Sequence, residues 1–292
     1  MRIAVTGKAG QVVTSLIERG GGAGHEVIAL GRPELDLAEP ASVARALGAA
    51  APDAVVSAAA YTAVDKAESE SGLAYAVNGD GAGAVAKAAK ALGVPLVHIS
   101  TDYVFDGTLD RPYVESDPTK PAGVYGASKL AGEQAVLAAH GDNSAVLRVA
   151  WVYSPFGANF VKTMLRLAGD RDEVSVVADQ LGNPTSALDI ADAILRIATN
   201  LVSDNNPALR GVFHMTARGE ASWADFAEAI FAASAAKGGP SARVKRITTA
   251  DYPTPAKRPA NSRLDCSLIA KVHGLALPGW RQSLDSVIAC LN

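Results

Sequence analysis

The hydrophobic positions in the first half of the chain fall into short apolar runs, separated by longer stretches with helical periodicity. Short runs bounded by glycine and polar residues are typical of buried strands, and the longer periodic stretches are typical of helices. The runs that predict strands cover residues 2–6, 26–30, 54–57, 95–100 and 145–149. The clearest helices are predicted over residues 72–92 and 125–139. This alternation predicts an α/β fold built on a Rossmann-type, doubly wound parallel sheet with right-handed crossovers.

The chain beyond residue 150 predicts a smaller C-terminal lobe. Helices are expected there over residues 159–168, 186–198 and 222–235. Ser222 ahead of Trp223-Ala-Asp225 resembles a capping box with Asp in place of Glu. A proline-rich extended segment follows, marked by Pro253, Pro255 and Pro259. We therefore predict a Rossmann domain over residues 1–150, to which later segments return, and a discontinuous substrate-binding lobe over residues 151–292.

A glycine turn joins the first predicted strand to a helical pattern. Gly7-Lys-Ala-Gly10 follows the strand at once, which is the order that a dinucleotide site needs. Gly7 permits the tight turn, and Gly10 lets the backbone approach a pyrophosphate at the helix N-terminus. Val12 and Val13 stand where the third glycine of the usual fingerprint is expected. The signal is therefore partial, and an ordinary strand-to-helix turn is the alternative.

The residues after the second predicted strand bear on the kind of dinucleotide. An acidic residue in this place commonly binds the ribose hydroxyls, whereas an arginine can pair with a 2′-phosphate. The chain has both, in Arg32 and Asp36. Arg32 favours NADPH without excluding NADH, and the alternative for Arg32 is a surface arginine before a proline turn.

Tyr125 and Lys129 stand four residues apart on a predicted helix, so both side chains lie on one face. A cation beside a phenol stabilises the phenolate and is expected to lower the tyrosine pKa from about 10, which suits a proton donor at neutral pH. Tyr-x-x-x-Lys alone is more often a solvated helix face. Ser100 and Thr101 add hydroxyl groups at a strand end, and Thr101 is the better candidate for a third catalytic group that binds a carbonyl oxygen.

Small side chains follow the third predicted strand. Ala58, Ala59 and Ala60 would let a cofactor lie against the backbone, although simple packing is the alternative in an alanine-rich chain. In parallel sheets, ligands bind beyond the carboxyl ends of the strands. The glycine turn, Asp36, the three alanines and Thr101 all fall at that edge of the predicted sheet.

Composition excludes several classes of function. The net charge is −3, and the chain has no Lys/Arg-rich run, which argues against a nucleic-acid partner and against a polybasic membrane anchor. No apolar stretch is long enough to span a bilayer, so a cytoplasmic protein is expected. Cys266 and Cys290 are not spaced as a C-x-x-C pair and are interpreted as free thiols. The five histidines are scattered singly, and we predict no metal site.

The motifs together resemble the extended short-chain dehydrogenase/reductases and, among them, the dTDP-4-dehydrorhamnose reductases. The glycine turn and Tyr-x-x-x-Lys identify only the superfamily. Ser100-Thr-Asp-Tyr-Val-Phe-Asp-Gly107 and Asp179-Gln-Leu-Gly-Asn-Pro-Thr185 narrow the resemblance to these reductases. Further matching blocks begin at Gly7, Ala58, Tyr125, Trp151, Asn159 and Arg258, so the resemblance runs nearly end to end.

The resemblance implies that NAD(P)H delivers a hydride to the 4-keto carbon of dTDP-6-deoxy-L-lyxo-4-hexulose, giving dTDP-L-rhamnose. Tyr125 would protonate the developing alkoxide, and Thr101 would hydrogen-bond the same oxygen. Lys129 would hold the nicotinamide ribose and keep the phenol acidic. The expected cofactor-binding residues are Gly7, Gly10, Gln11, Val12, Arg32, Asp36, Leu37, Ala58, Ala59, Ala60, Tyr125 and Lys129.

The resemblance also implies a pocket for the dTDP-sugar substrate. Aromatic rings suit the apolar face of a deoxysugar, and an anionic diphosphate needs cations or amide donors. Asn159, Lys162 and Arg258 would reach the diphosphate, with a surface position as the alternative for each, and a core tryptophan is the alternative for Trp151. The expected substrate-binding residues are Thr62, Val64, Asp102, Tyr103, Trp151, Asn159, Lys162 and Arg258.

The chain departs from the family pattern at one place. Some relatives form a dimer bridged by magnesium on glutamates, whose places here carry Ser15 and Leu188. A hard cation requires carboxylate or other oxygen ligands, so no magnesium site is expected, and either a monomer or a homodimer stays open.

Two other functions stay open at this point. The same scaffold carries nucleotide-sugar epimerases and dehydratases. The dehydratases add acidic groups near the tyrosine, and Gly123 and Val124 supply none. Some relatives are non-catalytic NADP-binding regulatory subunits. Intact Thr101, Tyr125 and Lys129 argue against that alternative.

Overall fold

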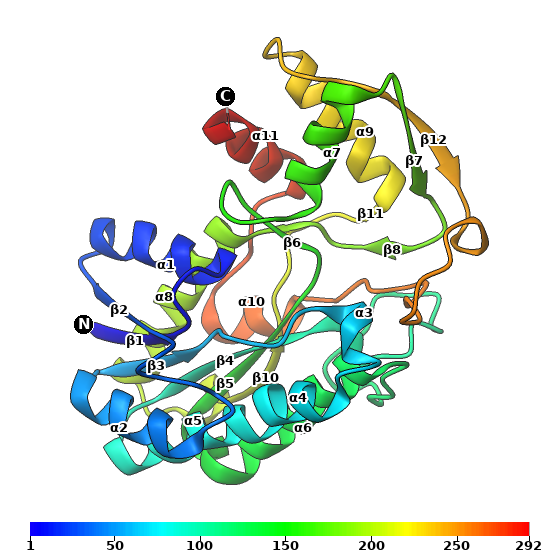
Figure 1. Ribbon diagram of the computed structural model, residues 1–292. Coiled ribbons are helices and arrows are strands. Elements are labelled where there is room, and N and C mark those ends of the chain that lie inside the picture. The colour runs from blue at the N-terminus through cyan, green and yellow to red at the C-terminus, as the bar shows by residue number, and fades with distance from the viewer. Residues whose placement is uncertain (292) are drawn as a thin grey trace.

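A six-stranded, fully parallel sheet forms the centre of the computed structural model, which describes residues 1–291 (Figure 1). The strand order is β10-β5-β4-β3-β1-β2. The chain runs outward from β1 to β2 and then returns to β3 on the other side of β1. The strand order therefore reverses between β1 and β3, which is the point where doubly wound sheets bind ligands. The strands are β1 (Arg2–Thr6), β2 (Glu26–Leu30), β3 (Ala54–Ser57), β4 (Leu96–Thr101), β5 (Ser144–Val149) and β10 (Gly211–His214).

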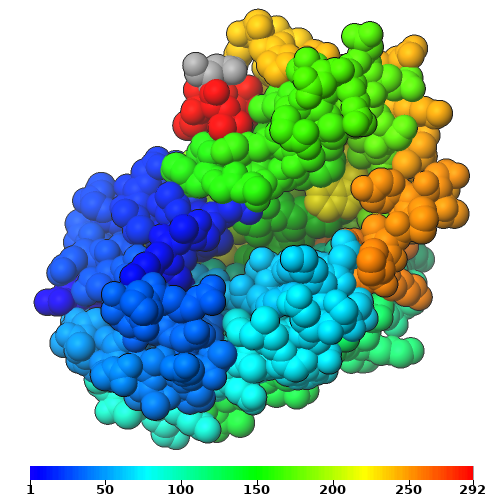
Figure 2. All heavy atoms as spheres, viewed as in Figure 1, coloured from blue at the N-terminus to red at the C-terminus, as the bar shows by residue number. Residues whose placement is uncertain are grey.

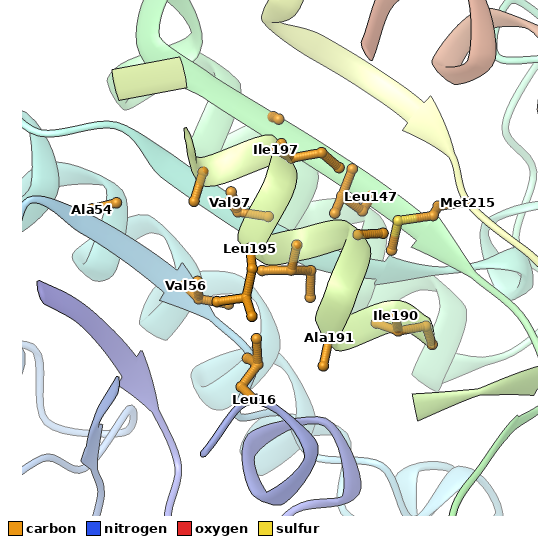
Figure 3. Close-up of a cluster of buried hydrophobic side chains, with 14 of the residues drawn as sticks. Leu16, Ala54, Val56, Val97, Leu147, Ile190, Ala191, Leu195, Ile197 and Met215 are labelled. Carbon is orange, nitrogen blue, oxygen red and sulfur yellow. The ribbon is translucent and has the colours of Figure 1, made fainter. Parts of the chain in front are cut away.

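Helices cover both faces of this sheet, because a parallel sheet is apolar on both sides. On one face, Leu16 of α1 and Ile190 of α8 pack with sheet residues such as Val56 and Leu147 (Figure 3). The other face has its own core, which is closed by α2, α5 and α6. The predicted fold class is confirmed. The bounds of these helices are α1 (Gln11–Gly22), α2 (Pro40–Ala50), α5 (Gly81–Leu92), α6 (Val124–His140) and α8 (Ala187–Ser203).

The helix predicted over residues 72–92 is interrupted. It consists of α4 (Ser71–Tyr75), a π-helical turn η1 (Ala76–Asp80) and α5. The turn carries Asn78, which is buried and accepts a hydrogen bond from Tyr61 N (2.8 Å) while its amide donates to Ser128 Oγ (3.0 Å). Single π-helical turns often occur at functional sites. Here the turn fastens the loop after β3 to α6.

The smaller lobe has a separate hydrophobic core. Its centre is α9 (Trp223–Ala235), which packs with α7 (Phe160–Asp170) and α11 (Trp280–Leu291). The capping box expected at Ser222 and Asp225 is present at the start of α9. A parallel pair, β7 (Glu173–Val177) and β12 (Arg243–Ile247), completes the lobe. The sequence pattern did not predict this pair, α2 or α11.

One helix lies in a different place from the one predicted. The helix expected in the smaller lobe at 186–198 is α8, and it packs on α1 and the central sheet, because its apolar side chains join the core of that face. The strand β10 after it also belongs to the central sheet. The domain boundary at residue 150 stays a prediction. The remaining short elements are α3 (Val64–Ala67), β6 (Val152–Tyr153), β8 (Leu181–Gly182), β9 (Thr185–Ser186), β11 (Ala221–Ser222) and α10 (Ser267–His273). Within residues 1–291, no helix combines the length and the hydropathy that a membrane crossing needs.

Candidate active site

Two cavities lie along the carboxyl edge of the central sheet. The larger measures about 660 Å³ and is lined both by strand-end residues, such as Thr101, and by Trp151 and Trp223. The smaller measures about 530 Å³ and lies beside Arg32. Both are lined by Gly7, Ala59 and Ala60, so they meet at the glycine turn. Figure 2 shows the molecule hollowed between its N-terminal part, in blue and cyan, and the smaller lobe above it.

The glycine turn has the backbone geometry that its sequence predicts. Gly7 has φ +105°, a conformation that side chains strongly disfavour, and a Cβ there would lie 3.2 Å from a methyl group of Val13. Gly10 is extended and is the N-cap of α1, with no side chain capping the helix. The first-turn N–H groups of α1 therefore face the larger cavity without intrahelical partners, as an anion site requires.

The side chain of Thr6, the last residue of β1, holds the loop after β3 by hydrogen bonds. Its Oγ1 accepts hydrogen bonds from Ala58 N and Ala59 N, each at 3.0 Å. Ala58, Ala59 and Ala60 all line the larger cavity. The structure thus brings the three alanines to the glycine turn, as the sequence predicted.

The smaller cavity gathers the residues that were expected to select the dinucleotide. Arg32 and Leu37 both line it, Arg32 as an exposed side chain and Leu37 as a buried one. Asp36 Oδ1 accepts a hydrogen bond from Ala38 N (3.0 Å), so part of this carboxylate is engaged by its own loop. Lys8 also lines the cavity and pairs with exposed Glu34 at 2.6 Å. Sequence reasoning missed Lys8, although its place inside the glycine turn was a signal for it.

Lys129 is buried one helical turn after Tyr125 on α6. Its Nζ donates a hydrogen bond to Ile99 O at 2.7 Å, at the end of β4. Desolvation lowers the Lys129 pKa to about 8, and the negative charge of Glu133 acts in the opposite direction. The ammonium group is therefore largely charged at pH 7.

The predicted lowering of the Tyr125 pKa is wrong for this structure. Desolvation of the phenol raises the pKa above its ordinary value, the charge of Asp102 raises it further, and the Thr101 hydroxyl group acts in the opposite direction. Burial outweighs the effect expected from Lys129 because a phenolate in a low-dielectric wall loses its hydration. The phenol consequently stays protonated at neutral pH, which is the form that a proton donor needs.

Thr101 and Asp102 lie where β4 turns into a short 3₁₀ helix. Thr101 Oγ1 donates to Asp102 Oδ1 (2.9 Å) and accepts from Tyr103 N (3.3 Å). Asp102 is only 3% exposed, and its Oδ2 has no hydrogen-bond partner within the described residues. Desolvation raises the Asp102 pKa to about 6, while the Ser262 and Thr101 hydroxyl groups oppose this shift. Thr101 and Asp102 both line the larger cavity.

Tyr103 and Trp151 form part of the cavity wall, with Thr62 and Val64 beside them. The Tyr103 ring meets the Tyr125 ring edge to face, with centroids 5.5 Å apart. Desolvation, followed by the charge of Asp102, raises the Tyr103 pKa to about 12. The expected sugar-side residues are therefore gathered around Tyr125.

Trp151 is held in an unusual conformation. Its φ is +47°, and its indole ring stacks on Trp223 with centroids 3.6 Å apart. A Cβ at Gly182 would overlap this indole, with Trp151 Nε1 2.6 Å away. Strained backbone in a cavity wall is typical of functional positions, which speaks against a simple core tryptophan. Sequence reasoning missed Trp223 and Gly182, because only the tertiary structure brings them to Trp151.

Three expected substrate residues do not line the larger cavity. Asn159 caps α7, where it accepts from Lys162 N (3.2 Å), and it donates to Ser154 O (2.8 Å). Lys162 Nζ lies 3.4 Å from Pro155 O. Local backbone groups thus engage both side chains.

Arg258 pairs instead with a side chain of α3. Its Nη2 lies 2.7 Å from Asp65 Oδ2, and Ala256 N donates to Asp65 Oδ1 at 3.2 Å. Arg258 Nη1 is buried and has no partner among the described residues. The proline-rich segment is therefore attached to α3 near Tyr103. The Arg258 guanidinium acts to lower the Tyr103 pKa, against the larger effect of desolvation.

Within residues 1–291, no group of three histidine, cysteine or acidic side chains has metal-binding geometry. Ser15 and Leu188, the two places named above for magnesium ligands, offer no carboxylate: Ser15 donates to Gln11 O (2.8 Å) and Leu188 is buried. Cys266 is half-buried and Cys290 is exposed, and both are free thiols.

Similarity to known proteins agrees with this geometry. The family model described as the RmlD substrate binding domain matches residues 1–292. A dTDP-4-dehydrorhamnose reductase of Sinorhizobium fredii is 52% identical over 291 residues, which cover 100% of this chain and 98% of the relative. The chain belongs to this reductase family. A Burkholderia thailandensis dTDP-4-dehydrorhamnose reductase is 46% identical, with 97% of each chain covered.

Solved structures of the reductase family superpose closely. A dTDP-4-dehydrorhamnose reductase from Clostridium acetobutylicum has a TM-score of 0.92 at 37% identity, covering 100% of this chain and 99% of its own. The Bacillus anthracis reductase in complex with NADP has a TM-score of 0.91 at 35% identity, covering 99% and 98%. A Thermus thermophilus UDP-glucose 4-epimerase, at 22% identity and a TM-score of 0.81, shares the fold.

Proposed function

We propose that this protein is a dTDP-4-dehydrorhamnose reductase, which reduces the 4-keto group of dTDP-6-deoxy-L-lyxo-4-hexulose to dTDP-L-rhamnose with NADPH. The observation that carries the proposal is the meeting of Thr101, Tyr125 and Lys129 in one cavity that also holds the glycine turn. Membership of the reductase family and the NADP complex of the B. anthracis relative support the choice of reaction and cofactor.

The site fits a dinucleotide along both cavities. The cradle at Gly7, which a side chain would fill, and the uncapped N-terminus of α1 suit the pyrophosphate. Gln11, Val12 and the three alanines line the path toward Lys129. The adenosine end would occupy the smaller cavity, where the exposed cations Arg32 and Lys8 suit a 2′-phosphate. The presence of these two cations in one cavity favours NADPH over NADH.

The catalytic residues divide the work of the reduction. Bound NADPH supplies the hydride for C4 of the sugar. Tyr125, protonated because its phenol is desolvated, gives its proton to O4 as negative charge develops there. The Thr101 hydroxyl group lines the same cavity, and in the complex it would turn its proton from Asp102 to O4. The Lys129 ammonium would hold the nicotinamide ribose and would add positive charge beside the developing alkoxide.

The sugar would lie against the rings of Tyr103 and Trp151, with Thr62 and Val64 at its edge and Asp102 below. Trp223 extends the aromatic wall. Asn159, Lys162 and Arg258 stay proposals for the diphosphate, of which Arg258 has the buried, unpartnered Nη1. Intact Thr101, Tyr125 and Lys129 favour the enzyme over a non-catalytic subunit. A monomer and a homodimer both stay open for this protein.

The test is to mix the purified protein with dTDP-6-deoxy-L-lyxo-4-hexulose and NADPH. We expect one NADPH to be consumed per sugar reduced, with dTDP-L-rhamnose as the product, and slower turnover with NADH. A folded protein that binds NADPH, as shown by cofactor fluorescence, yet does not oxidise it with this sugar would contradict the proposal.

A further inference from the structure

A buried ion pair lies directly behind the proposed catalytic residues. Glu133 is on α6, one turn beyond Lys129, and Arg148 is on β5; they are 2% and 4% exposed. Arg148 Nη2 lies 2.7 Å from Glu133 Oε2, and Arg148 Nε donates to Oε1 at 2.9 Å. This two-point geometry fixes the plane of the carboxylate.

The remaining polar atoms of the pair are also engaged. Ser100 Oγ donates to Glu133 Oε1 at 2.5 Å. Arg148 Nη1 lies 3.4 Å from His214 Nε2, and the guanidinium lies over the Phe105 ring, 5.0 Å from its centroid. Desolvation and the charge of Arg148 lower the His214 pKa to about 4, so this histidine is neutral and can accept from Arg148. The cluster is therefore a closed network.

The network joins the two elements that carry the catalytic groups. Ser100 stands between Ile99, whose carbonyl accepts from Lys129, and Thr101. Glu133 accepts the hydrogen bond from Ser100 and lies on the same face of α6 as Lys129. The end of β4 and the middle of α6 are thus tied together at two successive residues, 99 and 100.

Stability alone is a weak reason for such a pair. Burying two charges costs desolvation energy, and a well-packed hydrophobic pair of similar volume is often as stable or more so. Resting on the reductase function proposed above, we propose that Glu133, clamped by Arg148, is a positioning residue. It holds Ser100 and Thr101 against α6 and keeps the Lys129 ammonium charged.

The ionisable groups around Lys129 determine how far its ammonium group stays charged. Desolvation lowers the Lys129 pKa, and Glu133 is the group that raises it. Of the other ionisable groups nearby, His98 on β4 has its pKa lowered well below its usual range and is neutral. Tyr125 on α6 is protonated, Asp102 after β4 lines the same cavity, and Arg148 on β5 is paired with Glu133.

These charges determine in which direction the pH dependence of activity should shift when Glu133 is replaced. The charged form of Lys129 is the active one, so activity is present below its pKa of about 8 and is lost as pH rises through it. Removing the Glu133 charge lowers this pKa and moves the loss of activity to lower pH.

The experiment records kcat with saturating NADPH, and NADPH affinity from its fluorescence, as functions of pH for Glu133→Gln. We expect the alkaline limb of both curves to move down by about one pH unit, which is about a fivefold loss of kcat at pH 8. Glu133→Asp, which keeps the charge, should restore much of the limb. The affinity curve reports on Lys129 even if the sugar is a different one, so failure of this inference is distinguishable from failure of the proposed function.

Two further variants keep the test decisive if Glu133→Gln leaves Arg148 unpaired and does not fold. Glu133→Leu with Arg148→Met replaces the pair by apolar side chains and should fold with the lowered alkaline limb. Ser100→Ala removes only the link to β4, and we expect kcat to fall about tenfold with an unchanged alkaline limb. Wild-type pH profiles in every folded Glu133 variant, or wild-type kcat in Ser100→Ala, would overturn the inference.

Discussion

At the scale of single residues, the chemistry depends on which groups are desolvated. Tyr125 and Lys129 share one helix face, as their spacing predicts, but burial raises the pKa of the phenol and lowers that of the ammonium. Both shifts favour the neutral forms. The tyrosine thereby keeps its proton for the reaction, while the lysine depends on Glu133 for its charge.

Tyr125→Phe is expected to lower kcat by about 10²–10⁴, because general acid catalysis typically contributes that factor. The dissociation constant for NADPH should stay within about twofold, since the ring itself is retained. Steady-state kinetics and cofactor fluorescence measure the two effects. Tyr252→Phe, at an exposed ring, is the matched control and should behave as wild type. A Tyr125→Phe enzyme with near-normal kcat would remove the assigned role.

Asp102 should make the stability of the folded protein depend on pH. Its pKa is about 6 in the folded protein and about 3.9 when unfolded, so its charged form costs stability in the fold. This cost appears as pH rises from about 4 to about 6, and above that it amounts to about 2–3 kcal/mol.

Asp102→Asn should therefore be more stable than wild type at pH 7, with a smaller difference at pH 4. Urea denaturation at the two pH values measures the free energies of unfolding. The same free-energy difference at both pH values would show that Asp102 does not titrate in this range.

At the scale of elements, short contacts between segments set the shape of the sugar site. Trp151 reaches its place because Gly182 leaves room for the indole and Trp223 stacks on it. The helices predicted over residues 159–168 and 222–235 correspond to α7 and α9 of this region, whereas its strands, all short or unpredicted, do not follow from hydrophobic periodicity. The contact between β8 and Trp151 does not follow from it either, because the two segments are distant in sequence and meet only in the fold.

Gly182→Ala is expected to displace Trp151 and raise KM for the nucleotide sugar about tenfold, with NADPH affinity unchanged. Steady-state kinetics at varied sugar concentration measures the change. Gly169→Ala is the control, because a Cβ there meets nothing within 4 Å. An unchanged KM in Gly182→Ala would mean that the indole position does not matter for the substrate.

The ion pair between Asp65 and Arg258 joins α3 to the proline-rich segment. Both side chains are partly exposed, so the pair should contribute less than about 1 kcal/mol to stability. Asp65→Asn should nevertheless raise KM for the sugar several-fold, because the segment and Tyr103 lose a fixed neighbour. Glu173→Gln, which breaks another exposed pair with Arg243, is the control and should leave KM unchanged. A KM change in both variants, or in neither, contradicts this role.

At the scale of the whole molecule, the catalytic edge of the sheet faces a second lobe. The sequence predicts the sheet, the glycine turn and the catalytic group, because each depends on local pattern and on the rule that ligands bind at strand ends. It places Asn159, Lys162 and Arg258 at the substrate less well. Their distances to the cavity depend on how two cores pack, and nearby protein groups engage all three.

Cofactor choice is a second property that depends on the assembled molecule. Arg32 was visible in the sequence, but Lys8 reaches the same cavity only because β1 and β2 are neighbours. The pKa of Tyr125 is a third such property. Periodicity gives the spacing of Tyr125 and Lys129, but the desolvation that raises the Tyr125 pKa depends on the assembled fold.

The proposed reduction delivers a hydride to C4 of the sugar in the cavity where Tyr125 supplies the proton. The most direct measurement is a single turnover with NADPH that carries deuterium at the transferred position, followed by NMR of the isolated product. We expect dTDP-L-rhamnose with one deuterium at C4 from the wild-type protein and almost none formed by Tyr125→Phe in the same time. Deuterium at another carbon, retention of the label in the cofactor, or equal product from both proteins would contradict it.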